Sequence, residues 1–463
     1  MQTNHTFSKR HIERFNRAVI VGLGVTGYSV VRYLCAQGIN VAVVDSRTEP
    51  PMADRLRDEY PKVQVSYGEF TSKRTQALVA DAELLVVNPG VSLKTQIVQD
   101  AKRRGATLTG DIELFLQANK MPVIAITGSN GKSTVTTLVG QMAQAAGLRP
   151  LVAGNIGYAA LDALTDKVSY DLAVLELSSF QLESTQVVGA KSAAILNISA
   201  DHMDRYDSFG DYVLAKAKIL KGSEIAVLPS HDSSVSQITT QSKVLSFGLQ
   251  EPTHKKEFGI EQRQGRRWLT KGKHKLMAVR DIPLIGSHNI SNVLAAFALL
   301  DPFKLDLGAQ VGAVKSFKGL PHRMQTVAQN KGVTWVNDSK ATNVGAAVSA
   351  LTSIDKPIIW IAGGDGKGAD FSDLAQAMTA QIKLLVALGR DAPSIIAAVR
   401  AKVEVVQASS MQDAVEIADK HASEGDVVLL SPACASFDMY RNYEERGEDF
   451  ATCVLARTKE AGL

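Results

Sequence analysis

An alternation of short apolar runs, glycine-rich turns and helical stretches recurs three times along the chain, and it constrains the fold more than any other feature. Such alternation indicates strands joined by helical crossovers, which build parallel sheets of the α/β class. The chain has 463 residues, enough for about three domains at roughly 150 residues each. We therefore expect an α/β protein of three domains.

The first block, residues 1–110, carries a glycine motif after its first strand. An apolar run at residues 18–21 is followed by Gly22, Gly24 and Gly27, and a second run at residues 41–44 ends in Asp45. Glycines at this spacing, with an acidic residue closing the next strand, are typical of a dinucleotide-binding turn. The motif predicts a site for a diphosphate or a nucleoside without identifying the ligand.

The second block, residues 111–319, contains the loop TGSNGKST (residues 127–134) between the apolar run 123–126 and a helix start. Its glycines let backbone N–H groups face a phosphate, and the helix N-terminus adds positive potential. Lys132 can reach the β- and γ-phosphates of a nucleotide, and Ser133 can ligate Mg²⁺. The loop is a short variant of the usual phosphate-binding motif, because Ile126 stands where that motif has its first glycine.

Further polar side chains in this block are candidates for a metal site. Glu176 closes the strand at residues 172–175, where a parallel sheet places a carboxylate beside the phosphate loop. Taken alone, Glu176 is explained equally well as a capping or surface acid. His202 follows the strand at residues 193–196 and is flanked by acidic residues, which favours a function. Lys216 and Lys218, judged by pattern alone, are typical of the solvated face of a helix.

The third block, residues 320–463, holds three loops that each follow an apolar run, at residues 337–343, 363–368 and 431–438. Loops of glycine and other small residues that carry a lysine suit anionic ligands. Plain turns explain the first two of these loops equally well when each is taken singly. Cys434, in the third, is expected to be a small buried residue, since no pairing of a histidine with a cysteine is evident.

Eight motifs occur in one order from Thr127 to Asp438: TGSNGKST, LELSSFQLE, DHMDR, SHNISN, GLPHR, NDSKATN, GGDGK and SPACASFD. Together they resemble the Mur ligase family over all but about the first fifteen residues. The first motif alone would also fit folylpolyglutamate synthetases. NDSKATN, SPACASFD and the intact glycine motif of the first block point to the members that add D-glutamate, with a sister Mur ligase as the alternative.

The resemblance implies a Rossmann-like N-terminal domain, a central phosphate-loop domain with a parallel sheet, and a Rossmann-like C-terminal domain. It implies ATP-dependent ligation of D-glutamate to UDP-N-acetylmuramoyl-L-alanine through an acyl phosphate, in peptidoglycan precursor synthesis. Two magnesium ions would assist, with Ser133, Glu176, His202 and a carbamylated Lys216 as their ligands. The position of this lysine in the family pattern is fixed by Tyr212 four residues earlier, and Lys218 is the fallback.

The same resemblance implies three groups of binding residues. The uridine diphosphate part of the substrate would lie against Val25, Thr26, Asp45, Ser46, Arg47, Gly90 and Asn155, with His202 also near the substrate. ATP or the hinge would be contacted by Gly128, Ser129, Asn130, Gly131, Lys132, Ser133, Thr134, Asn289, Asn292, His322, Arg323, Asp338 and Lys340. The D-glutamate pocket would comprise Thr342, Lys367, Ser436, Phe437 and Tyr443. The catalytic residues would be Lys132, His202 and Lys216. The family usually has phenylalanine where this chain has Tyr443.

Bulk properties exclude several classes of partner. The net charge of +4 is too weak and dispersed to indicate nucleic acid, and the densest basic stretch, Lys255–Lys275, is typical of an exposed hairpin edge. Three cysteines without CxxC spacing fit a reducing compartment. Neither an apolar N-terminal segment nor a membrane-spanning run is evident. We expect a cytoplasmic protein, monomeric and not inserted in a membrane.

Two other classes of function remain as alternatives. A nicotinamide-dependent oxidoreductase would explain the first block but leaves the second phosphate loop without a role. A nucleotide switch without catalysis would explain both nucleotide motifs but has no need of the third set of polar loops.

Overall fold

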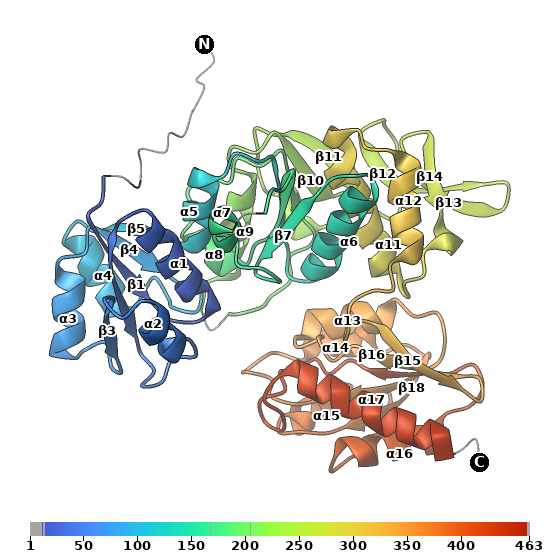
Figure 1. The fold of residues 1–463 in the computed structure, drawn as a ribbon. Coiled ribbons are helices and arrows are strands. Elements are labelled where there is room, and N and C mark those ends of the chain that lie inside the picture. Colours follow the sequence, from blue (N-terminus) through green and yellow to red (C-terminus); the bar gives the residue numbers. More distant parts are fainter. Residues whose placement is uncertain (1–11, 13, 167, 204, 461–463) are drawn as a thin grey trace.

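The protein is described from a computed structural model, in which residues 12, 14–166, 168–203 and 205–460 are placed. Three separate sheets succeed one another along the chain, and each is covered by helices (Figure 1). The N-terminal unit lies at one end of the molecule, and the central unit contacts both of the others. This arrangement confirms the predicted α/β architecture of three domains.

The N-terminal sheet is wholly parallel, with strand order β3-β2-β1-β4-β5. Reversal of the order at β1 makes a crevice at the carboxyl ends of β1 and β4, which is where such sheets bind ligands. Its elements are β1 (Arg17–Val21), α1 (Val25–Ala36), β2 (Asn40–Asp45), α2 (Ala53–Glu59), β3 (Gln64–Tyr67), α3 (Lys73–Ala80), β4 (Leu84–Val87), α4 (Gln96–Arg103) and β5 (Thr107–Thr109).

The central sheet has nine strands in the order β14-β13-β12-β11-β10-β9-β6-β8-β7, and the phosphate-loop strand β6 lies between β8 and β9. Its strands are β6 (Val123–Thr127), β7 (Pro150–Gly154), β8 (Leu172–Glu176), β9 (Ser192–Ile195), β10 (Ile225–Pro229), β11 (Lys243–Phe247), β12 (Glu257–Arg263), β13 (Arg266–Lys271) and β14 (His274–Ala278). Its helices are α5 (Asp111–Ala118), α6 (Lys132–Ala145), α7 (Asp162–Thr165), α8 (Ser179–Glu183), α9 (Phe209–Ala217), α10 (Ser233–Ser236), α11 (Ser287–Leu300) and α12 (Leu307–Ser316).

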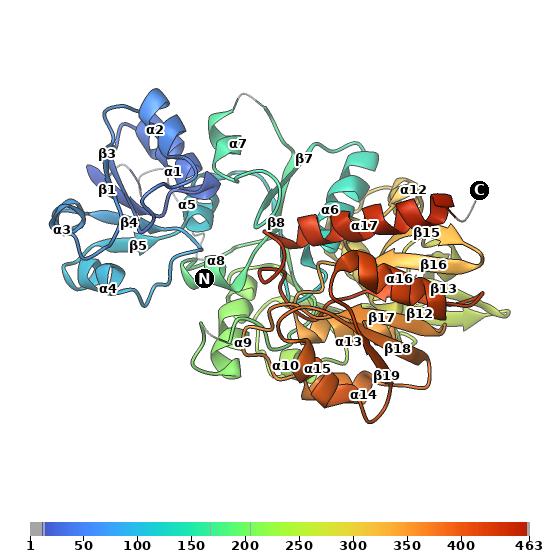
Figure 2. The same ribbon diagram turned by 90° about the horizontal axis from the view of Figure 1, so that it is seen from below.

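The C-terminal sheet is parallel except for its antiparallel edge strand β15, and its order is β15-β16-β20-β17-β18-β19. Figure 2 shows α17 lying along one side of this sheet. The elements are β15 (Gln325–Asn330), β16 (Val333–Asn337), α13 (Val344–Thr352), β17 (Ile358–Ala362), α14 (Ser372–Ala377), β18 (Ile382–Ala387), α15 (Ala392–Val399), β19 (Glu404–Gln407), α16 (Met411–His421), β20 (Val427–Leu430) and α17 (Tyr443–Glu460).

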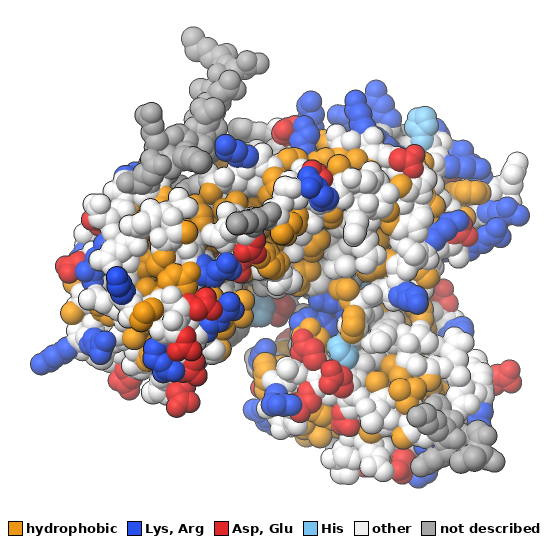
Figure 3. All heavy atoms as spheres, viewed as in Figure 1, with side chains coloured by type: hydrophobic (Ala, Val, Ile, Leu, Met, Phe, Trp, Pro, Cys, Tyr) orange, Lys and Arg blue, Asp and Glu red, His pale blue; other side chains and the backbone are white. Residues whose placement is uncertain are grey.

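The basic stretch forms the outer edge of the central sheet, as expected. Strands β12, β13 and β14 pair antiparallel there, and one side of the meander is buried by residues such as Phe258 and Leu269. On the other side Lys and Arg side chains reach solvent (Figure 3). Across the described part of the chain, no helix has both the length and the apolar character needed to cross a bilayer.

Candidate active site

The glycine motif of the N-terminal unit closes the carboxyl end of β1. Gly22 has a φ of +98°, a left-handed conformation that favours glycine, and a Cβ on Gly27 would lie 2.2 Å from the Gly22 carbonyl oxygen. A Cβ on Gly24 would meet no atom within 4 Å. The first and third glycines are therefore required by the turn and by helix packing. The middle glycine faces open space that a diphosphate can approach.

The acidic residue predicted for this site sits at the end of β2, directly beside the glycine loop. Asp45 is buried, and its carboxylate accepts hydrogen bonds from the Leu23 backbone N–H (2.6 Å) and from the Arg47 backbone and guanidinium. Burial raises the pKa of Asp45, but its hydrogen bonds with Arg47 outweigh this effect and the pKa is lowered overall. The carboxylate is thus a fixed anion at the mouth of the crevice.

The other residues predicted for the uridine substrate surround this crevice with one exception. Val25 and Thr26 begin α1, Ser46 and Arg47 follow β2, and Gly90 follows β4. Asn155 instead lies in the central unit at the end of β7, where its side chain donates to the Glu176 carboxylate at 2.9 Å. Asn155 therefore lies beside Glu176 in the central domain and not at the glycine motif of the first.

The phosphate loop runs from β6 into α6, as predicted. Gly131 has a φ of +83°, and a Cβ there would lie 2.6 Å from the Asn292 side-chain oxygen, so only glycine fits. Lys132 Nζ donates to the carbonyl oxygens of Gly128 and Ser129, each at 2.8 Å. Burial lowers the pKa of Lys132, and the nearby Glu176 carboxylate opposes that effect. The ammonium is held over its own loop, within reach of a phosphate bound there.

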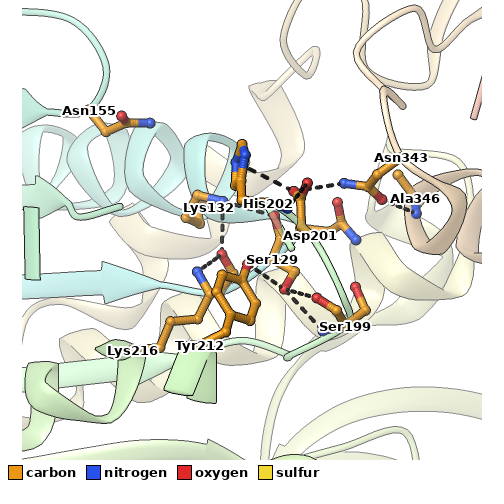
Figure 4. Close-up of polar contacts among 12 residues, drawn as sticks. Ser129, Lys132, Asn155, Ser199, Asp201, His202, Tyr212, Lys216, Asn343 and Ala346 are labelled. Carbon is orange, nitrogen blue, oxygen red and sulfur yellow. Dashed lines mark hydrogen bonds and ion pairs between the residues drawn. The ribbon is translucent and has the colours of Figure 1, made fainter. Parts of the chain in front are cut away.

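Lys216 is not a solvated residue, and that interpretation of its helix was wrong. Its side chain is buried against the phosphate loop, and Nζ donates to the Gly128 carbonyl oxygen at 2.9 Å. Figure 4 shows the ammonium groups of Lys132 and Lys216 converging on one carbonyl oxygen of this loop, that of Gly128. Burial, reinforced by the charge of Lys132, lowers the pKa of Lys216 well below its usual value.

Lys218, the fallback candidate, is exposed and donates to the Glu183 carbonyl oxygen. The interpretation as a solvated lysine therefore holds for Lys218, which follows the end of α9. The structure brings the other lysine, four residues after Tyr212, to the phosphate loop.

Glu176 lies at the end of β8, in register with Ile126 of β6, so its carboxylate is beside the phosphate loop. The side chain is buried; one oxygen accepts from Asn155, and the other, Oε2, has no hydrogen-bond partner among the described residues. A buried carboxylate oxygen without a partner is costly unless a cation is near. This observation fits the predicted role of Glu176 as a ligand of magnesium.

His202 adopts a left-handed conformation (φ +56°) in the loop after β9. Its ring packs on Phe180 with 4.9 Å between centroids, and its Nε2 lies 3.8 Å from an Asp201 carboxylate oxygen. Within the described residues, no group of three His, Cys, Asp or Glu side chains is close enough to hold a metal. Two magnesium ions would therefore need ligands beyond these four residue types, such as phosphate oxygens, water, Ser133 or a modified lysine.

Eight of the thirteen candidates for contact with ATP or the hinge line one pocket between the central and C-terminal units: Asn130, Gly131, Thr134, Asn289, Asn292, Arg323, Asp338 and Lys340. Arg323 reaches across to donate to the Ser133 hydroxyl at 2.7 Å. Burial raises the pKa of Asp338 to about 7 and lowers that of Lys340 to about 8. The pocket is polar and is shared between two domains.

Four of the five residues predicted for D-glutamate lie on loops at the carboxyl edge of the C-terminal sheet, and the fifth, Tyr443, is the first residue of α17. Lys367 and Phe437 are exposed, and the ammonium lies 5.4 Å from the ring centroid. Ser436 is buried. The Nζ atom of Lys340, from the neighbouring nucleotide pocket, lies 3.8 Å from the centroid of the Tyr443 ring. Thr342 follows Lys340 in the loop after β16. Lys367 thus presents an exposed ammonium at this edge, which suits a carboxylate of the ligand.

Arg446 was not predicted, yet it joins the loops of this edge. It is buried on α17 and donates to Ser339 and to the carbonyl oxygens of Cys434 and Ala435. Burial lowers the pKa of Arg446 to about 10. In sequence it lies among charged helix residues, and no local signal separates it from a solvated arginine. Cys434 is buried beneath it, as expected.

Three models of protein families match the chain in the order of its sheets. They are described as the Mur ligase MurD-like N-terminal domain (residues 16–110), the Mur ligase middle domain (126–300) and the Mur ligase glutamate ligase domain (322–434). The chain belongs to the Mur ligase family.

Relatives of this Mur ligase are similar over nearly their whole length. A protein of Pseudomonas aeruginosa named UDP-N-acetylmuramoylalanine–D-glutamate ligase is 46% identical over 441 residues, covering 94% of this chain and 97% of the relative. A protein of the same name from Marinobacter nauticus is 47% identical, covering 95% and 98%.

Solved structures share the fold of this Mur ligase at low sequence identity. A MurF ligase of Thermotoga maritima in complex with ADP has a TM-score of 0.58 at 13% identity, covering 96% of this chain and 97% of the other. The MurC ligase of the same organism, a UDP-N-acetylmuramate–alanine ligase, has a TM-score of 0.57 at 18% identity, with coverage of 95% and 99%. At these identities the likeness supports the three-domain fold alone.

Proposed function

We propose that this Mur ligase joins D-glutamate to UDP-N-acetylmuramoyl-L-alanine at the expense of ATP, in the cytoplasmic synthesis of peptidoglycan precursors. The observation that carries the proposal is the identity of 46–47%, over almost the full chain, with relatives named for that ligation. The geometry supports it with a crevice open to a diphosphate, a pocket for a nucleotide and a sheet edge that carries the exposed Lys367 ammonium. A sister Mur ligase would use the same arrangement with another amino acid.

The division of labour follows the three sheets, with boundaries at residues 1–110, 111–319 and 320–463. The first domain binds the uridine diphosphate through the glycine loop and through Asp45, which offers a fixed carboxylate. The pocket between the second and third domains holds ATP. The third domain binds D-glutamate at the edge formed by Thr342, Lys367, Ser436, Phe437 and Tyr443, where the Lys367 ammonium suits a carboxylate.

The reaction has two steps. The γ-phosphoryl group passes from ATP to the alanyl carboxylate of the substrate, giving ADP and an acyl phosphate. The amine of D-glutamate then attacks the acyl carbon, the C–N bond forms, and phosphate leaves. Both steps place negative charge on oxygens near the phosphate loop, and Lys132 and Arg323 supply fixed positive charge there.

Magnesium, when bound, would neutralise part of the charge on the transferring phosphate. Glu176, with its unpartnered oxygen, and His202 would hold the ions, and Ser133 would be freed from Arg323 to join them. The neutral form that burial favours for Lys216 can take up CO₂, and the resulting carbamate would offer anionic oxygens, which Mg²⁺ prefers.

Release of phosphate tests the activity directly. We expect the chain to release phosphate only with UDP-N-acetylmuramoyl-L-alanine, ATP and D-glutamate together, and not when D-glutamate is replaced by L-alanine, glycine or a diaminopimelate. Preference for another amino acid would favour the sister ligase. Turnover of a nicotinamide cofactor, or nucleotide exchange without ligation, would favour the two other classes.

Domain closure is expected, because the three groups of candidate residues sit on three separate sheet edges and the reacting groups must converge. The C-terminal domain should rotate about the segment near Gly319–Pro321. Contacts between the two domains beside this segment include Arg323 with Ser133 and Asn343 with Asp201. Small-angle scattering should show a smaller radius of gyration with an ATP analogue and UDP-substrate together. An unchanged radius would contradict closure.

A further inference from the structure

Arg205 bridges the N-terminal and central domains through a set of contacts that the proposed mechanism does not use. Its guanidinium donates to the carbonyl oxygens of Pro89 (2.9 Å) and Val91 (3.2 Å), both in the loop after β4. The side chain is largely buried, with 14% exposed, and lies 3.5 Å from the Glu183 carboxylate. A charged donor shared between two carbonyls holds that loop more firmly than a neutral hydrogen bond would.

The loop that Arg205 holds belongs to the substrate crevice. Val21 of β1 is in register with Val87 of β4, so the loop after β4 lies beside the glycine loop after β1. Asn88 donates to the carbonyl oxygens of Val21 and Gly22, which joins the two loops. Gly90, a candidate contact of the sugar or diphosphate, is exposed and stands in the chain between Pro89 and Val91, whose carbonyls Arg205 engages.

On its other side, Arg205 packs on Phe180, which in turn contacts His202, the candidate magnesium ligand. The guanidinium carbon lies 3.8 Å from the centroid of the Phe180 ring, and the His202 ring packs against that same ring with 4.9 Å between centroids. Phe180 therefore has a cation and an imidazole as direct neighbours. Displacing the arginine would change the support of Phe180 and, through it, the orientation of His202.

We propose that Arg205 is a positioning residue that couples the substrate loop at Pro89–Val91 to the orientation of His202, so that binding of the UDP-substrate and assembly of the metal site depend on one another. The proposal rests on the proposed function for the identity of the substrate. Arg205 need not touch a reacting atom. It fixes the positions of the substrate loop in the N-terminal domain and of His202 in the central domain.

A matched control is available in Arg32, which also joins these two domains. Arg32 on α1 forms ion pairs with Asp162 (2.8 Å) and Asp166 (3.2 Å) of the central domain. Its hydrogen bonds and ion pairs are to Asp162 and Asp166, and not to the substrate loop or to Phe180. Removing its charge weakens the same domain interface without touching the route proposed for Arg205. A loss of general interface stability would therefore appear in both variants.

The test compares Arg205→Met, Arg205→Lys, Phe180→Leu and Arg32→Met with the wild-type chain. Calorimetry in the absence of ATP measures the Kd of UDP-N-acetylmuramoyl-L-alanine, and steady-state assays measure each KM and the Mg²⁺ concentration for half-maximal rate. For Arg205→Met we expect the Kd to rise at least about tenfold, because two charge-assisted hydrogen bonds are lost. The Mg²⁺ midpoint should rise as well, while the KM for D-glutamate stays within about twofold.

The other variants separate the contact of Arg205 with the substrate loop from its contact, through Phe180, with His202. Phe180→Leu should raise the Mg²⁺ midpoint with little change in substrate Kd, and Arg205→Lys should give intermediate values because lysine keeps one donor. Arg32→Met should leave both quantities unchanged. Equal effects of Arg32→Met and Arg205→Met, or a normal Kd in folded Arg205→Met and Arg205→Lys, would overturn the proposal. A wild-type chain that does not bind the UDP-substrate would instead overturn the proposed function.

Discussion

Lys132→Ala should abolish ligation while leaving the binding of the UDP-substrate nearly intact. Lys132 lies over the phosphate loop of the central domain, and the uridine crevice is at the carboxyl ends of β1 and β4 in the N-terminal sheet. Loss of one positioned donor to a transferring phosphoryl group costs on the order of 10²–10³ in rate. Phosphate release measures the rate, and calorimetry measures substrate affinity. Turnover near that of the wild type would refute the assignment of this loop to ATP.

Arg323 offers a useful comparison for this variant. It also places positive charge at the phosphate loop, but from the C-terminal domain and through the Ser133 hydroxyl. Arg323→Met should therefore reduce the rate and also weaken compaction by ligands. Lys132→Ala should leave compaction by the UDP-substrate and an ATP analogue largely in place.

Lys216→Ala should lose nearly all activity, at least about a hundredfold, and acetate should restore part of it. Removal of groups that merely orient metal ligands already costs about 10–100-fold. Burial and the charge of Lys132 lower the pKa of Lys216, which favours the neutral amine, the form that adds CO₂. A short carboxylate can fill the position that the carbamate would leave. Activity measured against acetate concentration, with substitution confirmed to leave the fold intact, checks this expectation.

Lys218→Ala is the matched control, since Lys218 lies two residues away and is exposed. This variant should be mild and should not respond to acetate. Wild-type activity in Lys216→Ala, or an inactive Lys218→Ala, would show the assignment to be wrong. Loss of activity in Lys216→Ala without any rescue by short carboxylates would favour a role as a buried hydrogen-bond donor to Gly128.

Features confined to one strand and its turn could be predicted from the sequence. The strand ends at Asp45 and Glu176 and the loop leading to Lys132 were expected at these positions, because an apolar run followed by glycine or acid is a local pattern. Parallel topology then brings such ends to a common edge. The resemblance to a family added the grouping of the C-terminal loops, which local pattern alone left open.

Features that depend on packing between distant segments could not be predicted. Lys216 is separated by 88 residues from the Gly128 carbonyl that it contacts, and its helix looks solvated in sequence. Arg446 is buried by loops more than a hundred residues earlier as well as by its neighbours. Arg205 reaches carbonyls 114 and 116 residues away. Periodicity cannot reveal which of several charged side chains the tertiary structure will bury.

The nucleotide pocket has a consequence for how the molecule unfolds. Its walls come from two domains, whose described polar contacts across the boundary include Arg323 with Ser133 and Asn343 with Asp201. A ligand that binds only when both walls are in place stabilises the association of the two domains by its binding free energy. Without nucleotide, the two domains should melt in separate calorimetric transitions. At saturating nucleotide the transitions should merge, because the ligand makes one cooperative unit of two.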